Sequence, residues 1–433
     1  MFAHPEADGQ CAAAILISSL SQIGFSFHLR FTGYELTHED LERIQMTIPS
    51  GSNVIFVDIG TESLETLEFW DVNQISILDH HSRPKERELA KNIQLFNPLT
   101  FTDDLSVQIS SSALSYYIGT SISAENTYLS LFAIIGALGE RSTLNGAFKN
   151  IIKVAKRLKL ISNDKAVWFP DRSLPIASVL QNAGLSRLNT REQVEGFLKR
   201  LDIPLSAEEY SRPFYNLSES ENRRLISELT TNYGIDPKDI IKHDYQIINE
   251  PVISLRDART FAAKLNIFGW LQRPDIGVAL CLGDREEVLR EAISVEEEYN
   301  GIIQKELDWV TFEKKSQKFK ALYFFDGRKS GITVPILAPL INTLGKRRDL
   351  LPKPVLGCAR TYSGEIMIRV TNSHALGTDL DCQNLIKTMK GFMGSKARLT
   401  RSSVGTYGLI APEGELSSLI RRTDNHLAEN MRT

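Results

Sequence analysis

The chain has 433 residues, of which 42% are hydrophobic and 24% charged, with a formal net charge of −3 at pH 7. These proportions are ordinary for a soluble globular protein and, at this length, predict two or three domains. The four cysteines show no paired spacing, which excludes a disulfide framework and a cysteine-based zinc site. The opening residues lack a signal-peptide pattern. Apolar stretches such as Leu129–Leu138 are too short to span a membrane, so we expect a cytoplasmic protein without membrane contact.

The charge is unevenly distributed. Residues 314–433 contain 20 Lys and Arg against 9 Asp and Glu, a net charge of +11, so the first 313 residues carry −14. This asymmetry is expected where a basic part binds a polyanion and an acidic part holds metal ions. The alternative interpretation is unselected variation in surface charge.

The first 145 residues alternate short apolar strands with helices. The runs Asn53–Asp58 and Gln74–Asp79 each end in aspartate and are typical of buried parallel strands. Helices are expected at Cys11–Gln22, Glu39–Met46, Ser106–Ile118 and Thr127–Leu138. The alternation predicts an α/β domain with a doubly wound parallel sheet over residues 1–145. Ligands bind such sheets beyond the carboxyl ends of the strands, where both aspartates fall.

Residues 146–313 are predicted to form a mostly helical insertion or connecting domain. Ser218 and Glu221 have the spacing of a capping box, which predicts a helix start. Further helices are expected at Asp257–Asn266 and Arg285–Leu307, with one strand, Ile276–Leu282, between them.

From residue 314 the alternation of strands and helices returns. Strands are expected at Phe319–Phe325, Pro354–Arg360 and Glu365–Val370, and helices at Val334–Leu344, Leu380–Lys390 and Leu416–Asn430. Residues 314–433 should therefore form a smaller, basic α/β domain suited to binding substrate.

Four short clusters contain the residues suited to metal chemistry. They are His4-Pro-Glu6-Ala-Asp8-Gly9 ahead of a helix, Asp58 after one strand, Asp79-His80-His81 after the next, and Glu140 after a helix. Such mixed carboxylate and imidazole ligands suit Mn²⁺, with Mg²⁺, Co²⁺ or Zn²⁺ as alternatives. Two ions about 3.5–4 Å apart can polarise a phosphoryl group and activate a water. A single strand-terminal Asp caps a turn more often than it binds a metal, and a His-His pair is more often structural than metal-binding. The metal site is therefore indicated by the four clusters in this order, and not by any one of them.

This order, H-x-[D/E]-x-D-G, a strand-terminal Asp and then D-H-H, resembles the DHH phosphoesterases. That family includes RecJ nucleases, oligoribonucleases, cyclic-dinucleotide phosphodiesterases and family II pyrophosphatases. The resemblance implies two ions bridged by one aspartate. The implied ligands are His4, Glu6 and Asp58 for one ion, and Asp8, Asp58, His80 and Glu140 for the other. It also implies that His81 faces the substrate phosphate and that Asp79 orients the neighbouring histidines.

Further segments narrow the resemblance to archaeal RecJ-like proteins, among them the GINS-associated nucleases. These segments are Leu255–Asn266, Pro274–Gly283, Glu298–Asn300, Lys353–Arg360 and Ile368–Arg369. The implied partners are single-stranded nucleic acid and a GINS-type replication protein, for which residues 150–312 are the expected docking region.

The sequence departs from the family pattern in three places. Glu6 and Glu140 stand where the family usually has Asp, and the longer side chains could shift an ion by roughly an ångström, which can cost on the order of 100-fold in rate. The family's Gly-Gly-His loop, which binds substrate, is replaced here, with Ser403 at the histidine position. The remaining substrate-binding candidates are Arg369, Arg401, Gly405 and Gly408. Finally, only three residues precede His4, so the first strand is very short or the true start lies upstream.

Three functions remain open from the sequence. A metal-dependent exonuclease acting on single-stranded DNA or RNA in replication or repair is favoured by the complete ligand set and the basic C-terminal region. A weakly active or inactive scaffold subunit of a GINS/MCM-type helicase complex is favoured by Glu6, Glu140 and Ser403. A small-molecule phosphodiesterase or pyrophosphatase is disfavoured by the long middle region.

Overall fold

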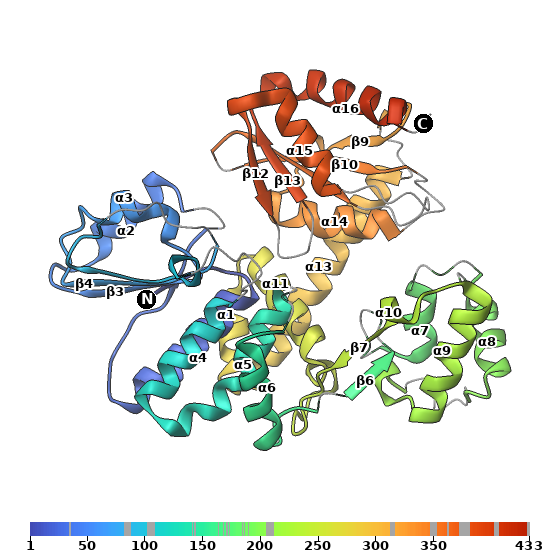
Figure 1. The fold of residues 1–433 in the computed structure, drawn as a ribbon, viewed down its shortest axis with the longest axis horizontal. Helices are drawn as coiled ribbons and strands as arrows, with labels where there is room; N and C mark the ends of the chain where they lie inside the picture. The colour runs from blue at the N-terminus through green and yellow to red at the C-terminus, as the bar shows by residue number, and fades with distance from the viewer. Residues whose placement is uncertain are drawn as a thin grey trace. The chain divides into compact units, whose positions relative to one another are not determined.

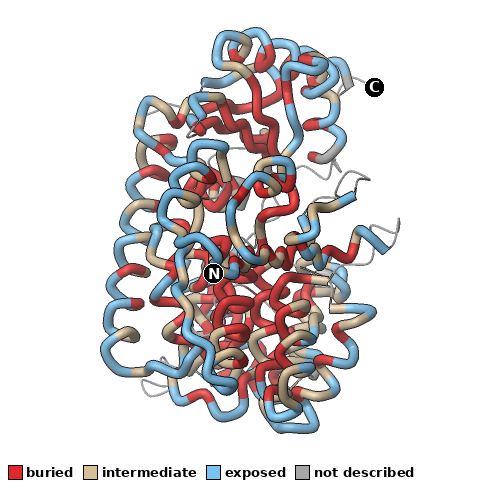
Figure 2. The backbone as a smooth tube through the Cα atoms, turned by 90° about the vertical axis from the view of Figure 1, so that its left-hand side faces the viewer, coloured by how far each residue is buried: buried red, intermediate tan, exposed pale blue. Residues whose placement is uncertain are grey.

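The computed structural model describes two compact units, Met1–Glu296 and Glu297–Thr433 (Figure 1). The description omits residues 34–35, 82–87, 102–108, 141, 143, 163, 168, 170–171, 173, 184, 186, 189, 205–211, 312–316, 347–352, 362, 372–381, 402–406 and 431–433. Figure 2 shows that buried residues run through the interior of each unit while exposed residues cover its outside. None of the described helices has the length and apolar character needed to cross a membrane.

The first unit is built on a five-stranded parallel sheet with the order β2-β1-β3-β4-β5. Its strands are β1 (Phe2–Ala3), β2 (Arg30–Phe31), β3 (Asn53–Val57), β4 (Gln74–Leu78) and β5 (Ile93–Phe96). Because successive side chains of a strand point to opposite faces, Phe56 and Val57 pack into different cores. Both faces are therefore buried, which confirms the predicted doubly wound α/β fold.

Helices cover both faces of this sheet. On the Phe56 face lie α2 (His38–Thr47) and α3 (Leu64–Leu67). On the Val57 face lie α1 (Ala7–Gln22), α4 (Ser111–Ile122), α5 (Ser130–Gly139) and α6 (Phe148–Arg157), joined in the same core by α11 (Ala258–Trp270), α12 (Pro274–Cys281) and the start of α13 (Glu287–Thr311). Residues of three helices from far along the chain thus complete the core beneath the N-terminal sheet.

The strand predicted at Ile276–Leu282 is wrong, because residues 276–281 belong to helix α12 and Leu282 is its C-cap. Pro274 opens this helix at a position where a missing backbone N–H costs nothing. Its apolar residues are buried on more than one side, and Gly277 lies against Gln10 of α1. A short apolar run buried all round has no readable period, so it cannot be distinguished from a strand by pattern alone.

Part of the middle region has a core of its own. It combines the antiparallel pair β6 (Asp164–Val167) and β7 (Ile241–Asp244) with α7 (Ile176–Asn182), α8 (Arg191–Arg200), α9 (Glu219–Tyr233) and α10 (Pro237–Ile240). The predicted capping box is confirmed, since the Glu221 N–H donates to Ser218 Oγ at 3.2 Å and the Ser218 N–H donates to Glu221 Oε2 at 2.7 Å.

The second unit contains a six-stranded sheet with the order β12-β13-β11-β10-β9-β8, parallel only between β9 and β10. The strands are β8 (Gln317–Lys318), β9 (Tyr323–Asp326), β10 (Val355–Arg360), β11 (Ile366–Thr371), β12 (Arg398–Arg401) and β13 (Tyr407–Ala411). Helices α15 (Cys382–Met393) and α16 (Leu416–Asn430) pack on one face, while α14 (Val334–Lys346) contacts β10 and β11. The expected strand Phe319–Phe325 is interrupted, because the Phe319 N–H donates to the Leu322 carbonyl in a turn.

Candidate metal centre

The carboxyl ends of three adjacent strands bring the proposed ligands together. The backbone N–H groups continue the sheet by one residue on each strand: His4 donates to Val57, Asp58 to Leu78 and Asp79 to Phe96, at 3.1, 2.7 and 3.1 Å. The parallel register therefore sets these three residues side by side at one edge of the sheet.

Asp58 lies at the centre of the cluster. Its Oδ2 is 3.5 Å from His4 Nδ1, and its Oδ1 is 3.3 Å from His80 Nε2, which is itself 3.6 Å from Asp8 Oδ2. Ligand atoms of Asp58, His80 and His81 all lie within 4.8 Å of one another. The Asp58 backbone has φ +63°, a left-handed conformation that costs an L-residue about 1–2 kcal/mol and persists only where its surroundings enforce it.

Asp79 is fully engaged in positioning its neighbours. Its Oδ1 accepts the backbone N–H groups of His80 and His81 at 2.7 and 3.2 Å and lies 2.9 Å from His81 Nδ1. Its Oδ2 accepts the Thr61 N–H at 2.9 Å. Burial opposes ionisation of Asp79, but its contacts with His81 outweigh burial and hold its pKa well below the usual value. Because Nδ1 of His81 is taken by Asp79, only Nε2 of this half-exposed ring is left for an ion or a phosphate.

Asp8 is held by the amino-terminal end of α4. The Ser111 N–H donates to Oδ2 at 2.6 Å, and the N–H (3.1 Å) and hydroxyl of Ser112 donate to Oδ1. A Cβ atom added at Gly136 would lie 2.7 Å from Asp8 Oδ1, so this close approach requires glycine. Burial, followed by repulsion from Asp58, raises the pKa of Asp8 to about 6.

The two glutamates differ in their environments. Glu6, which precedes α1, accepts a hydrogen bond from the Trp270 indole N–H at 3.2 Å. Glu140 follows α5, and burial, then repulsion from Asp58 and Glu6, raises its pKa to about 8. Negative charges therefore converge on one buried point, and a divalent cation would relieve their repulsion.

Helix α11 fixes the loop that contains His4 and Glu6. Asn266 Oδ1 accepts the Ala7 N–H at 2.8 Å, and a Cβ at Gly269 would lie 2.2 Å from the Pro5 carbonyl oxygen. On the other side of the loop, Gly9 meets the His4 carbonyl just as closely. The region between residues 146 and 313 therefore contributes positioning residues, which sequence reasoning missed. The only signal for Asn266 was its place in the segment Leu255–Asn266, which resembles archaeal RecJ-like proteins, and Gly269 and Trp270 lie outside that segment.

The proposed substrate-binding residues lie in the second unit. Arg369 on β11 is paired in register with Gly408 on β13, where a Cβ atom would lie 2.9 Å from Arg369 Nη1. Glycine at 408 thus leaves room for the buried guanidinium. Arg401 ends β12, opposite Tyr407. Ser403 and Gly405 lie outside the described residues.

The donor set fits a divalent ion. Both carboxylate oxygens of Asp58 are buried and accept no well-formed hydrogen bond from the described residues. Nitrogen and oxygen donors without cysteine sulfur suit Mn²⁺ and related ions. The structure thus assembles His4, Asp8, Asp58, His80 and His81 directly around one point, with Glu6 and Glu140 within electrostatic reach of it.

Comparison with known proteins shows which solved structures share this fold. No family model matches the sequence. An uncharacterized protein of Methanocaldococcus jannaschii is 25% identical over 439 residues, covering 99% of this chain and 93% of that protein. The solved structure of CDC45 from Entamoeba histolytica matches with a TM-score of 0.57 and 14% identity, over 98% of this chain and 94% of that one.

RecJ structures match as well. RecJ from Thermus thermophilus, in complex with Mn²⁺, matches with a TM-score of 0.56 and 12% identity over 99% of this chain but 51% of its own length. An exonuclease RecJ bound to manganese gives a TM-score of 0.52 at 12% identity, over 99% of this chain and 89% of that one. At such identities the likeness shows the fold, and that fold is the one expected of a RecJ-like protein of the DHH family.

Proposed function

We propose that this chain, a RecJ-like protein of the DHH family by its fold, is a metal-dependent exonuclease that cleaves phosphodiester bonds in single-stranded DNA or RNA. The observation that carries the proposal is the convergence of His4, Asp8 and His80 on Asp58, whose two oxygens face different histidines. Such a carboxylate can bridge two ions, with His4 and Glu6 completing one set of ligands and Asp8, His80 and Glu140 the other. The RecJ structures that contain Mn²⁺ support this assignment.

Bound Mn²⁺, or Mg²⁺ or Co²⁺ in its place, would supply an activated water and neutralise charge on the phosphoryl oxygens. The chain's own residues hold and orient the reactants. Asp79 fixes the His81 ring through Nδ1, so Nε2 can donate to a phosphate oxygen. In the second unit, Arg369 would contact the phosphate backbone, and Arg401, Ser403, Gly405 and Gly408 are proposed as further substrate-binding residues.

Cleavage of end-labelled strands tests the proposal. DNA and RNA labelled at either end and incubated with Mn²⁺ should be shortened, and the label should reveal sugar preference and polarity. Asp8→Ala should abolish cleavage. Cleavage that persists in Asp8→Ala would come from a contaminating nuclease, and cleavage absent with every divalent ion would refute the enzymatic proposal.

Binding of the strand is a separate prediction. Because Arg369 is proposed to contact one phosphate, Arg369→Ala should weaken binding equally for all sequences. It should also reduce the slope of log affinity against log salt by about 0.7. Affinity that does not depend on salt would contradict a nucleic-acid role for the basic C-terminal unit.

The second candidate is a scaffold role in a replicative helicase complex. The match to CDC45 over 94% of that protein's chain favours it, as do the substitutions at Glu6, Glu140 and Ser403. The proposed partner is a GINS-type protein docking between residues 150 and 312. A pull-down with the full chain and a variant lacking residues 168–240 tests this docking site. Undiminished capture by the variant would exclude residues 168–240 as the docking site.

A further inference from the structure

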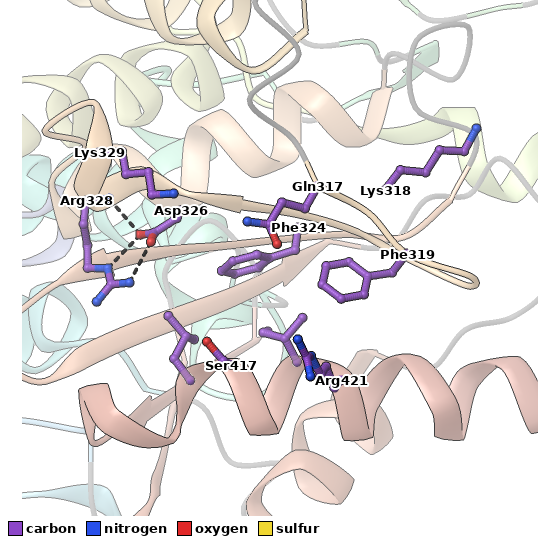
Figure 3. A pocket seen from close by; sticks show the side chains of 11 residues that line it. Gln317, Lys318, Phe319, Phe324, Asp326, Arg328, Lys329, Ser417 and Arg421 are labelled. Carbon is purple, nitrogen blue, oxygen red and sulfur yellow. Dashed lines mark hydrogen bonds and ion pairs between the residues drawn. The ribbon is translucent and has the colours of Figure 1, made fainter.

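The second unit has a pocket that the proposed catalytic role does not use (Figure 3). It lies where β8 and β9 meet the start of α16, and its volume is about 430 Å³. In the sheet order, β10 separates β9 from the strand that carries Arg369. The pocket is therefore distinct from the substrate-binding cluster on β11, β12 and β13.

The floor of the pocket is apolar and aromatic. Phe324 is 5% exposed and Phe319 is half-buried, and Figure 3 shows both rings directed toward α16. Leu416 and Ile420 of that helix are buried opposite them. A half-buried ring at the wall of an open pocket offers one face to a flat ligand.

The rim is cationic. Asp326 is the one carboxylate among the lining residues, and Arg328 engages it through Nε–Oδ1 and Nη2–Oδ2 contacts of 2.7 and 2.6 Å. By contrast, Lys329 and Arg421 are exposed, and neither forms an ion pair with any residue in the described part of the chain. Two cations are thus available beside an aromatic wall.

We propose that this pocket binds one nucleotide of a single-stranded nucleic acid, with its base against Phe319 and its phosphate between Lys329 and Arg421. Aromatic stacking is tolerant of base identity and is the usual device for holding unpaired bases. The volume lies within the range of small-ligand sites. This inference rests on the proposed function for its ligand, and it adds a second contact that would keep a strand attached to the basic unit.

Fluorescence anisotropy of the full chain with labelled dT20 and rU20, in EDTA so that no cleavage occurs, tests the pocket. The double variant Lys329→Gln/Arg421→Gln should bind about tenfold more weakly and lower the salt slope by about 1.4. Phe319→Leu keeps an apolar side chain but removes the ring, and should weaken binding at least about fivefold.

Two variants serve as matched controls. Arg422→Gln removes the same charge from the next position of α16, where the arginine contacts the Phe392 carbonyl instead of lining the pocket. Phe392→Leu removes a half-buried ring elsewhere in the same unit. Circular dichroism of every variant checks that the unit remains folded, and photo-crosslinking with 5-iodouracil should label Phe319.

The outcomes separate this inference from the proposed function. If the wild type binds strands and the pocket variants bind like their controls, the pocket assignment is overturned while the function stands. If the wild type binds no single strand, both fail. If polyglutamate competes as well as dT20 of equal charge, the pocket recognises an acidic chain rather than a nucleotide, and the assignment is again wrong.

Discussion

Asp58 permits a test in which charge and backbone strain are separated. Asparagine tolerates the left-handed conformation that Asp58 adopts at φ +63°, whereas alanine there costs about 1–2 kcal/mol. Repulsion from Asp58 contributes to the raised pKa values of Asp8, about 6, and Glu140, about 8. Despite this repulsion, and although burial opposes its ionisation, interactions with His81, His80 and His4 lower the pKa of Asp58, so its charge stabilises the fold. Asp58→Asn should therefore destabilise the metal-free protein, and Asp58→Ala should destabilise it by about 1–2 kcal/mol more because alanine also bears the backbone strain.

The effect on metal binding should be the same in both variants. At a free Mn²⁺ concentration 100 times the Kd, binding stabilises the wild type by about 2.7 kcal/mol. For a unit of this size that corresponds to a rise of about 5 °C in Tm. Both Asp58 variants should lose this rise in a thermal melt, and calorimetry should show loss of bound Mn²⁺. If Asp58→Asn retains the full shift and the wild-type stoichiometry, Asp58 does not bridge metal ions.

Three further predictions concern the surroundings of the site. Gly136→Ala places a Cβ atom 2.7 Å from Asp8 Oδ1, so the free energy of unfolding in denaturant should fall by about 1–3 kcal/mol and Mn²⁺ should bind more weakly. Gly196→Ala is the control, because nothing lies within 4 Å of the added Cβ atom, and it should not destabilise the protein. Trp270→Phe removes the indole donor to Glu6, so Mn²⁺ affinity should fall while the fold is unchanged. In the wild type, tryptophan fluorescence should be quenched when Mn²⁺ binds. Unaltered Mn²⁺ affinity in the variant would show that the hydrogen bond from Trp270 to Glu6 does not position the ligand loop. Because the folded protein raises the pKa of Glu140 to about 8, it binds protons that the unfolded chain has released. Without metal its stability should thus fall as pH rises from about 5 to 8, while Mn²⁺ affinity measured by calorimetry should rise. Glu140→Gln should flatten both trends.

Sequence reasoning succeeded where a short pattern determines the structure. Strand-terminal Asp58 and Asp79 were found because each follows a continuous apolar run, and both lie at the predicted edge of a parallel sheet. The capping box at Ser218 was equally local. The order of the four clusters predicts the candidate ligands, and the confirmed doubly wound fold explains why His4, Asp58 and Asp79 lie side by side.

The groups that position these ligands could not be found in this way. The hydrogen bond from Trp270 to Glu6 joins residues 264 apart in sequence, and those from Ser112 to Asp8 span 104. Nothing near Trp270 signals a metal-site partner. The prediction of a strand at Ile276–Leu282 failed for a related reason. This segment is buried by helices from other parts of the chain, and the segment's own sequence does not show that they pack against it.

The closure of the His4–Glu6 loop by α11 has a consequence for biosynthesis. When residue 145 has been made, all the proposed ligands of the first unit exist, but Asn266 and Trp270, which fix the loop, do not. At translation rates of about 5–20 residues per second, these residues follow after roughly ten seconds. We infer that the nascent chain passes through a stage with acidic ligands present but not yet arranged, so the ion is captured only after α11 has docked. Metal supply would then affect a late step in the folding of the first unit, not its start.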